Sequence, residues 1–142
     1  MTPISKKAQK ILDYLTRELE PGDSRKIDNA QGTFMAVHVS RIADDVYTVV
    51  HYYEQCGDLM CDPEIAYWRG PDQKFYPISY RQDGLGVYQE SVVFEAGVPA
   101  KVAPAVQRDQ AQFTTLWMTN IVQQQDLDMR KMGKPTVAGA AP

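Results

Sequence analysis

The residues best suited to chemistry lie between positions 44 and 64. This stretch has no lysine or arginine and holds six acidic side chains: Asp44, Asp45, Glu54, Asp58, Asp62 and Glu64. Carboxylates grouped in this way can bind a divalent cation or a basic protein surface. Acidic runs are, however, more often solvated surfaces. The stretch therefore indicates either a solvated loop or a surface that attracts positive charge.

A histidine in the same region makes it a candidate catalytic constellation. If residues 51–67 form a hairpin, the His51 imidazole could work with carboxylates as metal-assisted hydrolysis requires; these would be Glu54, Asp58, Asp62 and Glu64. The spacing matches neither an EF-hand loop nor an H-E-x-x-H pair. A metal-dependent hydrolase or nuclease, in which Arg81 steadies a phosphate, is therefore the alternative function.

Other reactive residues carry weaker patterns. Cys56 and Cys61 could join the two histidines, His38 and His51, in a zinc site, but C-x4-C without a partner motif is typical of free thiols. Neither a Ser-His-Asp arrangement nor a G-x-S-x-G motif occurs. The sequence therefore predicts no metal ligand, no cofactor and no catalytic nucleophile.

Aromatic residues are frequent in the middle of the chain. Aromatic side chains on an exposed sheet can stack on bases or contact a protein, although most tyrosines in strands pack in cores. Between residues 33 and 95 the cations are few: Arg41, Arg69, Lys74 and Arg81. Because cations supply most non-specific affinity for phosphates, nucleic-acid binding is not expected.

The first element that must position these residues is a helix. Apolar residues recur at helical spacing from Ile4 to Leu19. Thr2 suits the N-cap and Pro3 the first helical position, and residues 20–22 end the helix. The polar stretch 23–32 reads as a connection.

Five strands follow, in meander order. The expected ranges are 33–39, 46–53, 65–69, 75–80 and 87–95. The segments between them, including 54–64, read as connections. Pro77 lacks a ladder donor, which predicts an edge strand or a bulge.

A second helix closes the pattern after a connection at 97–104. Its expected buried stripe is Val106, Phe113, Leu116, Trp117, Ile121 and Gln124, whereas Gln110 is expected in solvent. The predicted fold class is α+β: a five-stranded antiparallel meander sheet with both helices on one face, in two layers. The predicted domain covers residues 1–126, and residues 127–142 form a flexible tail.

Size and charge limit the function classes. The chain has 142 residues, 44% of them hydrophobic, and a formal net charge of −3. These values predict one globular domain that folds without disulfides. No apolar run reaches the roughly 18 residues that a membrane span needs, and the N-terminus lacks the apolar core of a signal peptide. A cytoplasmic protein without membrane contact is the expectation.

Several strings over about residues 34–95 resemble a family of small uncharacterised proteins encoded on bacterial plasmids, integrative elements and phages. The strings are residues 51–55, 57–60, 62–64, 76–83 and 85–90. The resemblance implies an accessory protein of a mobile genetic element that modulates host defence. It implies no catalytic residue.

The predicted function is non-enzymatic binding of a protein partner. The candidate binding residues are His51, Tyr53, Glu54, Asp58, Asp62, Glu64, Tyr80, Arg81 and Asp83. The partner's identity and the oligomeric state stay open.

Overall fold

The computed structural model describes residues 1–30 and 32–132. Two helices flank the strands along the chain. The elements are α1 (Lys6–Leu15), β1 (Ser24–Ile27), β2 (Val37–Arg41), β3 (Val46–Gln55), β4 (Asp58–Arg69), β5 (Phe75–Gln82), η1 (Asp83–Leu85), β6 (Val87–Glu90), β7 (Val92–Glu95), β8 (Val98–Val102), α2 (Pro104–Gln124) and η2 (Met129–Lys131).

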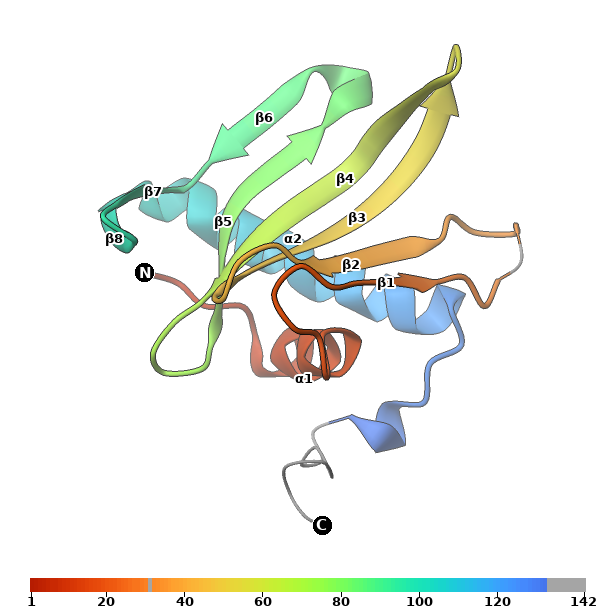
Figure 1. Cartoon of the computed structure of the whole chain (residues 1–142), viewed down its shortest axis with the longest axis horizontal. Coiled ribbons are helices and arrows are strands. Elements are labelled where there is room, and N and C mark those ends of the chain that lie inside the picture. Colours follow the sequence, from red (N-terminus) through yellow and green to blue (C-terminus); the bar gives the residue numbers. More distant parts are fainter. Residues whose placement is uncertain (31, 133–142) are drawn as a thin grey trace.

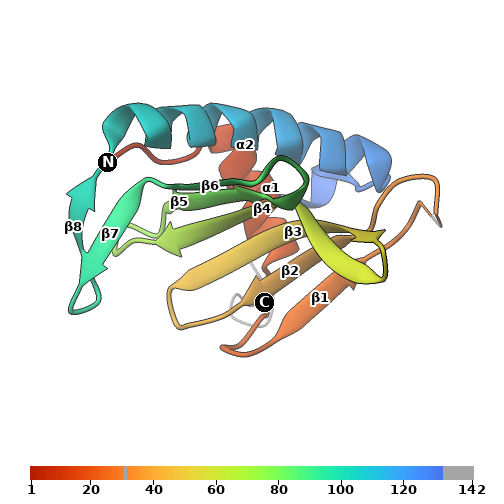
Figure 2. The ribbon, with the colours of Figure 1, turned by 90° about the horizontal axis from the view of Figure 1, so that it is seen from above.

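The strands β1 to β6 form one antiparallel sheet in chain order, and β7 pairs with β8 in a separate ribbon (Figure 1). Both helices pack on the same face of the sheet, and α1 passes behind the strands in Figure 2. No helix of the described residues covers the opposite face, which we call the open face. The predicted two-layer α+β fold is confirmed, with six strands in the main sheet in place of five.

The core lies between the sheet and the helices. Ile11, Leu12 and Leu15 of α1 meet Tyr67 and other inward side chains of the sheet, and all are fully buried. Burying such a side chain stabilises the fold by about 2 kcal/mol. The apolar residues that recur at helical spacing in the sequence therefore form the face of α1 that packs against the sheet.

The start of α1 differs from the prediction. Ser5 is the N-cap, and its Oγ accepts a hydrogen bond from the Ala8 N–H at 3.1 Å. The Thr2 N–H instead donates to Gln107 Oε1 at 2.7 Å, so residues before Ser5 bind α2 in an extended conformation. The helix also ends at Leu15, before the predicted stop.

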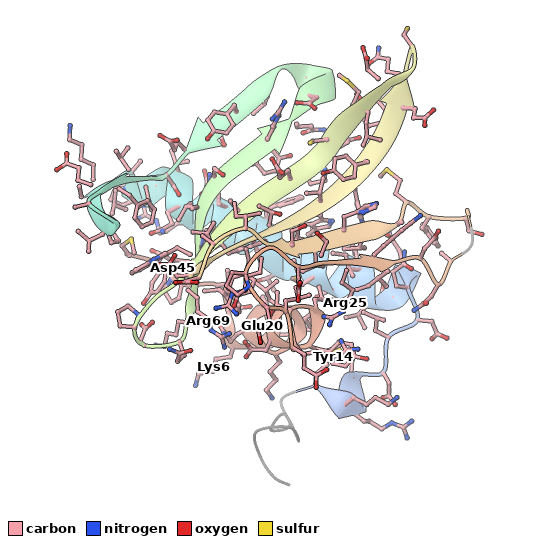
Figure 3. All side chains as sticks on the ribbon, in the orientation of Figure 1. Lys6, Tyr14, Glu20, Arg25, Asp45 and Arg69 are labelled. Atoms are coloured by element: carbon pink, nitrogen blue, oxygen red, sulfur yellow. The ribbon has the colours of Figure 1, made fainter. Side chains whose placement is uncertain are left out.

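The predicted connection at 23–32 contains strand β1. Arg25 donates to the carbonyls of Leu15 (2.6 Å) and Arg17 (2.7 Å), next to the end of α1 (Figure 3). Only Ile27 of this short strand is buried, so its sequence shows no apolar alternation. The next strand begins at Val37 and not at residue 33, because Phe34 and Met35 are exposed.

Residues 51–67 do form a hairpin, but its strands are longer than predicted: β3 and β4 continue into residues 54–64, which were expected to connect them. Its turn is Cys56-Gly57, and both residues have positive φ angles, 53° and 84°. Two positive φ angles match the type I′ turn, whose twist agrees with that of paired strands. Because the turn sequence is Cys-Gly and not Asn-Gly, it carried only a weak signal.

Pro77 lies on β5, an interior strand between β4 and β6. Of the two predicted outcomes the bulge is found, since the β4–β5 register shifts between Ala66 and Tyr67. The Pro77 carbonyl accepts bonds from Ser91 Oγ (3.0 Å) and Gln107 Nε2 (2.9 Å). A proline is therefore tolerated here because the irregular pairing needs no donor from it.

The predicted strand at 87–95 breaks at Ser91. This buried residue separates β6 from β7, which enters a different sheet. The Ser91 N–H donates to the Ile78 carbonyl, and the Ser91 carbonyl accepts from the Ala103 N–H. The predicted connection at 97–104 in turn contains β8, the partner of β7.

The buried stripe of α2 also departs from the prediction. Trp117 and Ile121 are buried as expected, but Leu116 is exposed. Gln107 and Gln110 are buried instead, contrary to the prediction for Gln110. Their amides bond to strand carbonyls, Gln107 to Pro77 and Gln110 to Gln89 (3.2 Å), so these polar residues can face the sheet.

The predicted tail begins within the described residues. Leu127 packs against the core, and Met132 is buried in it. The rest of the predicted tail, residues 133–142, lies outside the described residues. None of the described helices is long and apolar enough to cross a membrane.

Candidate functional site

The structure divides the predicted site residues between the two faces of the sheet. Because side chains alternate along a strand, each residue's face follows from the register. His51, Asp62 and Tyr80 lie on the helix side, whereas Glu64 and Arg81, which are direct partners in the β4–β5 register, lie on the open face. The predicted single constellation is therefore two separate groups.

His51 is a buried residue, 5% exposed, beneath α2. Its ring meets Trp117 edge to face, with centroids 5.4 Å apart. Burial lowers the pKa of His51, and the Asp62 carboxylate only partly opposes that shift. Within the described part of the chain, His51 Nε2 and Trp117 Nε1 lack a hydrogen-bond partner. His51 is therefore a neutral core residue near pH 7.

Asp62 and Tyr80 belong to a series of hydrogen bonds on the helix side of the sheet. Gln82 Nε2 donates to Asp62 Oδ1 (2.9 Å), and Tyr80 OH donates to Gln82 Oε1 (2.8 Å). Tyr80 also packs edge to face on Phe113, with centroids 5.6 Å apart. These hydrogen bonds connect β4 to β5 beneath α2, so the two side chains have a structural role.

Arg81 and Asp83 are committed to each other on the open side. Arg81 Nε donates to Asp83 Oδ1 at 2.7 Å, while the Cys61 N–H donates to Asp83 Oδ2 at 2.8 Å. The Cys61 N–H, followed by the Arg81 guanidinium, holds the pKa of Asp83 below its ordinary value. In this structure the Arg81 guanidinium therefore pairs with a carboxylate of its own chain.

The remaining predicted residues lie at the tip of the β3–β4 hairpin. Glu54 and Asp58 are exposed there, and Glu54 pairs with Leu59 in the register. Tyr53 OH lies 2.7 Å from the place that a Cβ would take at Gly84, so a side chain at position 84 would displace the Tyr53 hydroxyl. Cys56 is an exposed and Cys61 a buried free thiol.

The carboxylates do not converge on one point. Across residues 1–30 and 32–132, no group of three or more His, Cys, Asp or Glu side chains is placed to hold a metal ion. The β-bulge in β4 explains this result: the β3–β4 register shifts between Val50 and Tyr52, so Asp62 and Glu64, although two residues apart, face opposite sides of the strand.

The distal end of the open face is acidic and partly apolar. Alternation places Glu54, Leu59 and Glu64 on this face, beside Tyr88 and Glu90 of β6. Leu59, Leu85 and Tyr88 are largely exposed, at 62%, 71% and 62%. The ion pairs of the described residues include none of Glu54, Asp58, Glu64 and Glu90. Asp58, beside the hairpin turn, and Leu85 of η1 are exposed residues next to this face. We call the surface together with these two neighbours the acidic sheet end; it comprises Glu54, Asp58, Leu59, Glu64, Leu85, Tyr88 and Glu90.

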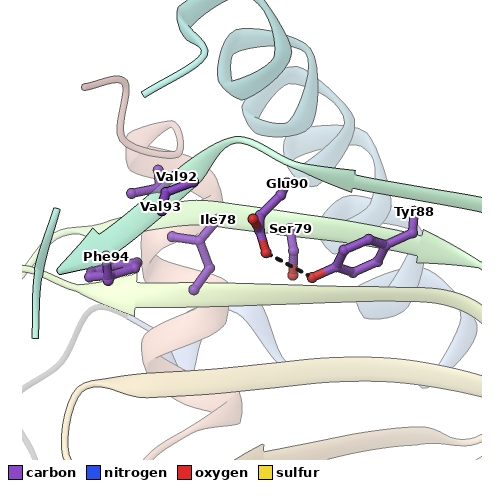
Figure 4. A pocket seen from close by; sticks show the side chains of 7 residues that line it. All are labelled: Ile78, Ser79, Tyr88, Glu90, Val92, Val93 and Phe94. Atoms are coloured by element: carbon purple, nitrogen blue, oxygen red, sulfur yellow. Dashed lines mark hydrogen bonds between the residues drawn. The ribbon is translucent and has the colours of Figure 1, made fainter. Parts of the chain in front are cut away.

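A pocket of about 310 Å³ adjoins the acidic sheet end where β5, β6 and β7 meet (Figure 4). Ser79, Tyr88 and Glu90 form one wall, and Tyr88 OH donates to Glu90 Oε2 at 3.2 Å. Ile78, Val93 and Phe94 form the apolar wall. The sequence did not indicate this pocket, because the break at Ser91 that brings Phe94 beside β5 carries no clear signal.

Comparison with curated proteins and with solved structures finds no match. The model of one protein family, described as "Domain of unknown function (DUF6908)", matches residues 6–127. The match runs from the first residue of α1 to beyond the end of α2, so it spans the helices as well as the sheet. The chain therefore belongs to the DUF6908 family.

Proposed function

We propose that this protein is a non-enzymatic binding module whose acidic sheet end takes up a basic, partly apolar segment of another protein. The observation that carries the proposal is the combination of unpaired carboxylates with exposed apolar side chains. Leu59 and Tyr88 lie among Glu54, Glu64 and Glu90 on a face that no described helix covers, and the exposed Asp58 and Leu85 lie next to it beside the hairpin turn and in η1.

The two kinds of side chain have separate roles in the proposed interface. The exposed apolar groups supply contact area, and aromatic residues such as Tyr88 are frequent anchors at interfaces. The carboxylates set the sign of the partner's charge and speed its approach. Arg81, the cross-strand partner of Glu64, is paired with Asp83, and the ion pairs of the described residues include none of Glu54, Asp58, Glu64 and Glu90.

The resemblance to proteins of plasmids, integrative elements and phages gives the proposal its setting. In that setting the partner is a host protein, the compartment is the cytoplasm, and the role is modulation of host defence. The two-faced distribution of His51, Asp62 and Glu64 supports binding over the alternative metal-dependent hydrolase.

The proposal is tested with a fluorescent peptide in which lysines and leucines are interspersed, and with its counterpart in which glutamates replace the lysines. Fluorescence anisotropy should show binding of the basic peptide alone. The double variant Glu54→Lys/Asp58→Lys should weaken that binding by at least about tenfold, because attraction becomes repulsion.

The matched control is Glu18→Lys/Glu20→Lys, which makes the same change in net charge at exposed residues after α1. This variant should keep most of the affinity. Equal losses in both double variants would show that net charge and not the acidic sheet end governs binding. Failure of the wild-type protein to bind the basic peptide contradicts the proposal.

A further inference from the structure

The pocket between β5, β6 and β7 has one polar and one apolar wall. Its polar wall carries three oxygen-bearing groups: Ser79 Oγ, Tyr88 OH and the Glu90 carboxylate. The β5–β6 register pairs Ser79 with Glu90, so these groups come from adjacent strands of the same sheet. Tyr88 and Glu90 are exposed, which leaves this wall open to an incoming group.

The apolar wall is held in place by packing. Phe94 lies edge to face against Trp68, with ring centroids 5.7 Å apart. Trp68 is in turn fixed by its indole N–H, which donates to Asp45 Oδ2 at 2.9 Å. Ile78, at the bulge of β5, completes the wall with Val93. A ligand therefore meets a preformed apolar surface opposite the oxygens.

The geometry points to this pocket as the receptor for a single lysine side chain of the bound partner. A lysine has a four-carbon apolar stem that can lie along Ile78, Val93 and Phe94. Its ammonium has three donors, which match the three oxygen-bearing groups of the opposite wall. An arginine has a planar fork suited to two oxygens of one carboxylate, but Glu90 Oε2 already accepts a hydrogen bond from Tyr88 OH, so a two-oxygen pairing of arginine with Glu90 would compete with that bond.

The electrostatics of the pocket agree with a cation as the ligand. Glu90 takes part in none of the ion pairs found among the described residues. Lys101 of β8 is the register partner of Val93, but it does not line the pocket. Burial and the nearby Glu90 carboxylate raise the pKa of Tyr88, so its hydroxyl stays protonated. The pocket thus offers an uncompensated carboxylate with a neutral hydroxyl beside it.

The assignment of the pocket rests on the proposed function, because it identifies which side chain of the partner the acidic sheet end binds. The direct test is an amide-resolved NMR titration of the protein with Nα-acetyl-lysine methylamide. The probe should shift the amides of Ser79, Tyr88, Glu90 and Phe94. The norleucine and Nε-acetyl-lysine analogues, which lack the charge, should bind at least about tenfold more weakly.

Glu90→Gln should lower the affinity for the lysine probe at least about fivefold, because the substitution removes the charge of the side chain and keeps its shape. Glu95→Gln, at a neighbouring exposed residue of β7 outside the pocket, should leave binding unchanged. Equal binding of the norleucine probe, tighter binding of the arginine analogue, or shifts confined to other residues would overturn the assignment.

The lysine–leucine peptide separates this inference from the proposed function. If the peptide loses affinity with Glu54→Lys/Asp58→Lys but not with Glu90→Gln, the pocket assignment is wrong and the proposed function stands. If the wild-type protein does not bind the peptide, the proposed function fails. The single-lysine titration then decides the pocket by itself.

Discussion

At the scale of single residues, His51 shows how burial changes a role. Its position among carboxylates made it a candidate binding residue and, in the alternative function, a catalytic imidazole, but its ring lies in the core against Trp117. The Asp62 carboxylate raises the pKa of His51, but burial lowers it by more, so the pKa of His51 is lowered overall. A buried neutral histidine links stability to pH.

The sign of that link follows from proton counting. Below the ordinary histidine pKa of about 6.5, the unfolded chain binds a proton that folded His51 does not, so the free energy of unfolding falls as pH falls. The slope from one group is at most about 1.4 kcal/mol per pH unit. Urea unfolding between about pH 5 and pH 7 should show a shallower dependence for His51→Gln than for the wild type.

The chain's other histidine provides the comparison. His38 is half-buried on the open face, where burial followed by Lys26 lowers its pKa. His38→Gln should change the pH dependence less, since solvent reaches its ring. If His51→Gln left the pH dependence of the free energy of unfolding unchanged, His51 would gain its proton equally in the folded and unfolded states.

At the scale of elements, Gln107 connects three parts of the fold. Its amide accepts from the Thr2 N–H and donates to the Pro77 carbonyl, so α2, the N-terminal segment and the β5 bulge meet at one fully buried side chain. Such a polar residue is tolerated in a core because both ends of its amide are bonded.

Replacing Gln107 with leucine should therefore lower the free energy of unfolding by about 1–3 kcal/mol, because bonded groups lose their partner. Chemical denaturation measures this loss. The matched control is Gln112→Leu, an exposed position of the same helix, which should change stability by less than about 0.5 kcal/mol. Similar losses at both positions would show that the change reflects leucine itself and not the lost bonds.

At the scale of the whole molecule, a group of lysines lies far from the acidic sheet end. Lys6, Lys10 and Lys74 line a pocket of about 510 Å³ beside the start of α1. In Figure 1, α1 and the tip of the β3–β4 hairpin lie at opposite ends of the molecule. Separated charges of this kind generally orient charged molecules that approach a protein, an effect that salt screens.

The distribution of carboxylates leads to a prediction about metals. Because Asp62 and Glu64 face opposite sides of β4, divalent cations should find no shared site on the hairpin. Thermal unfolding in Mg²⁺, Mn²⁺, Ca²⁺ or Zn²⁺ should therefore differ from that in EDTA by less than about 1 °C. A rise of several degrees with one metal, together with cleavage of nucleic acid, would favour the alternative hydrolase.

Much of the fold could be predicted because its signals are local. The apolar spacing of α1 and the alternation of β3 each depend on neighbours a few residues away. Strands β1 and β8 were missed for the opposite reason: few of their side chains are buried, so their sequences carry no periodicity. The buried face of α2 was only partly predicted, because the bonds that allow Gln107 and Gln110 inside come from distant strands.

The sequence by itself determined the α+β class, the helices at either end and the acidic character of residues 44–64. Composition and short-range periodicity suffice for these features. Only the tertiary structure decided which face each candidate residue occupies, because a continuous hairpin and one bulge in β4 set the alternation. The tertiary structure also created the pocket. Phe94 comes near Ser79 and Glu90 because β6 ends before Ser91 and the following strand, β7, places Phe94 against Trp68.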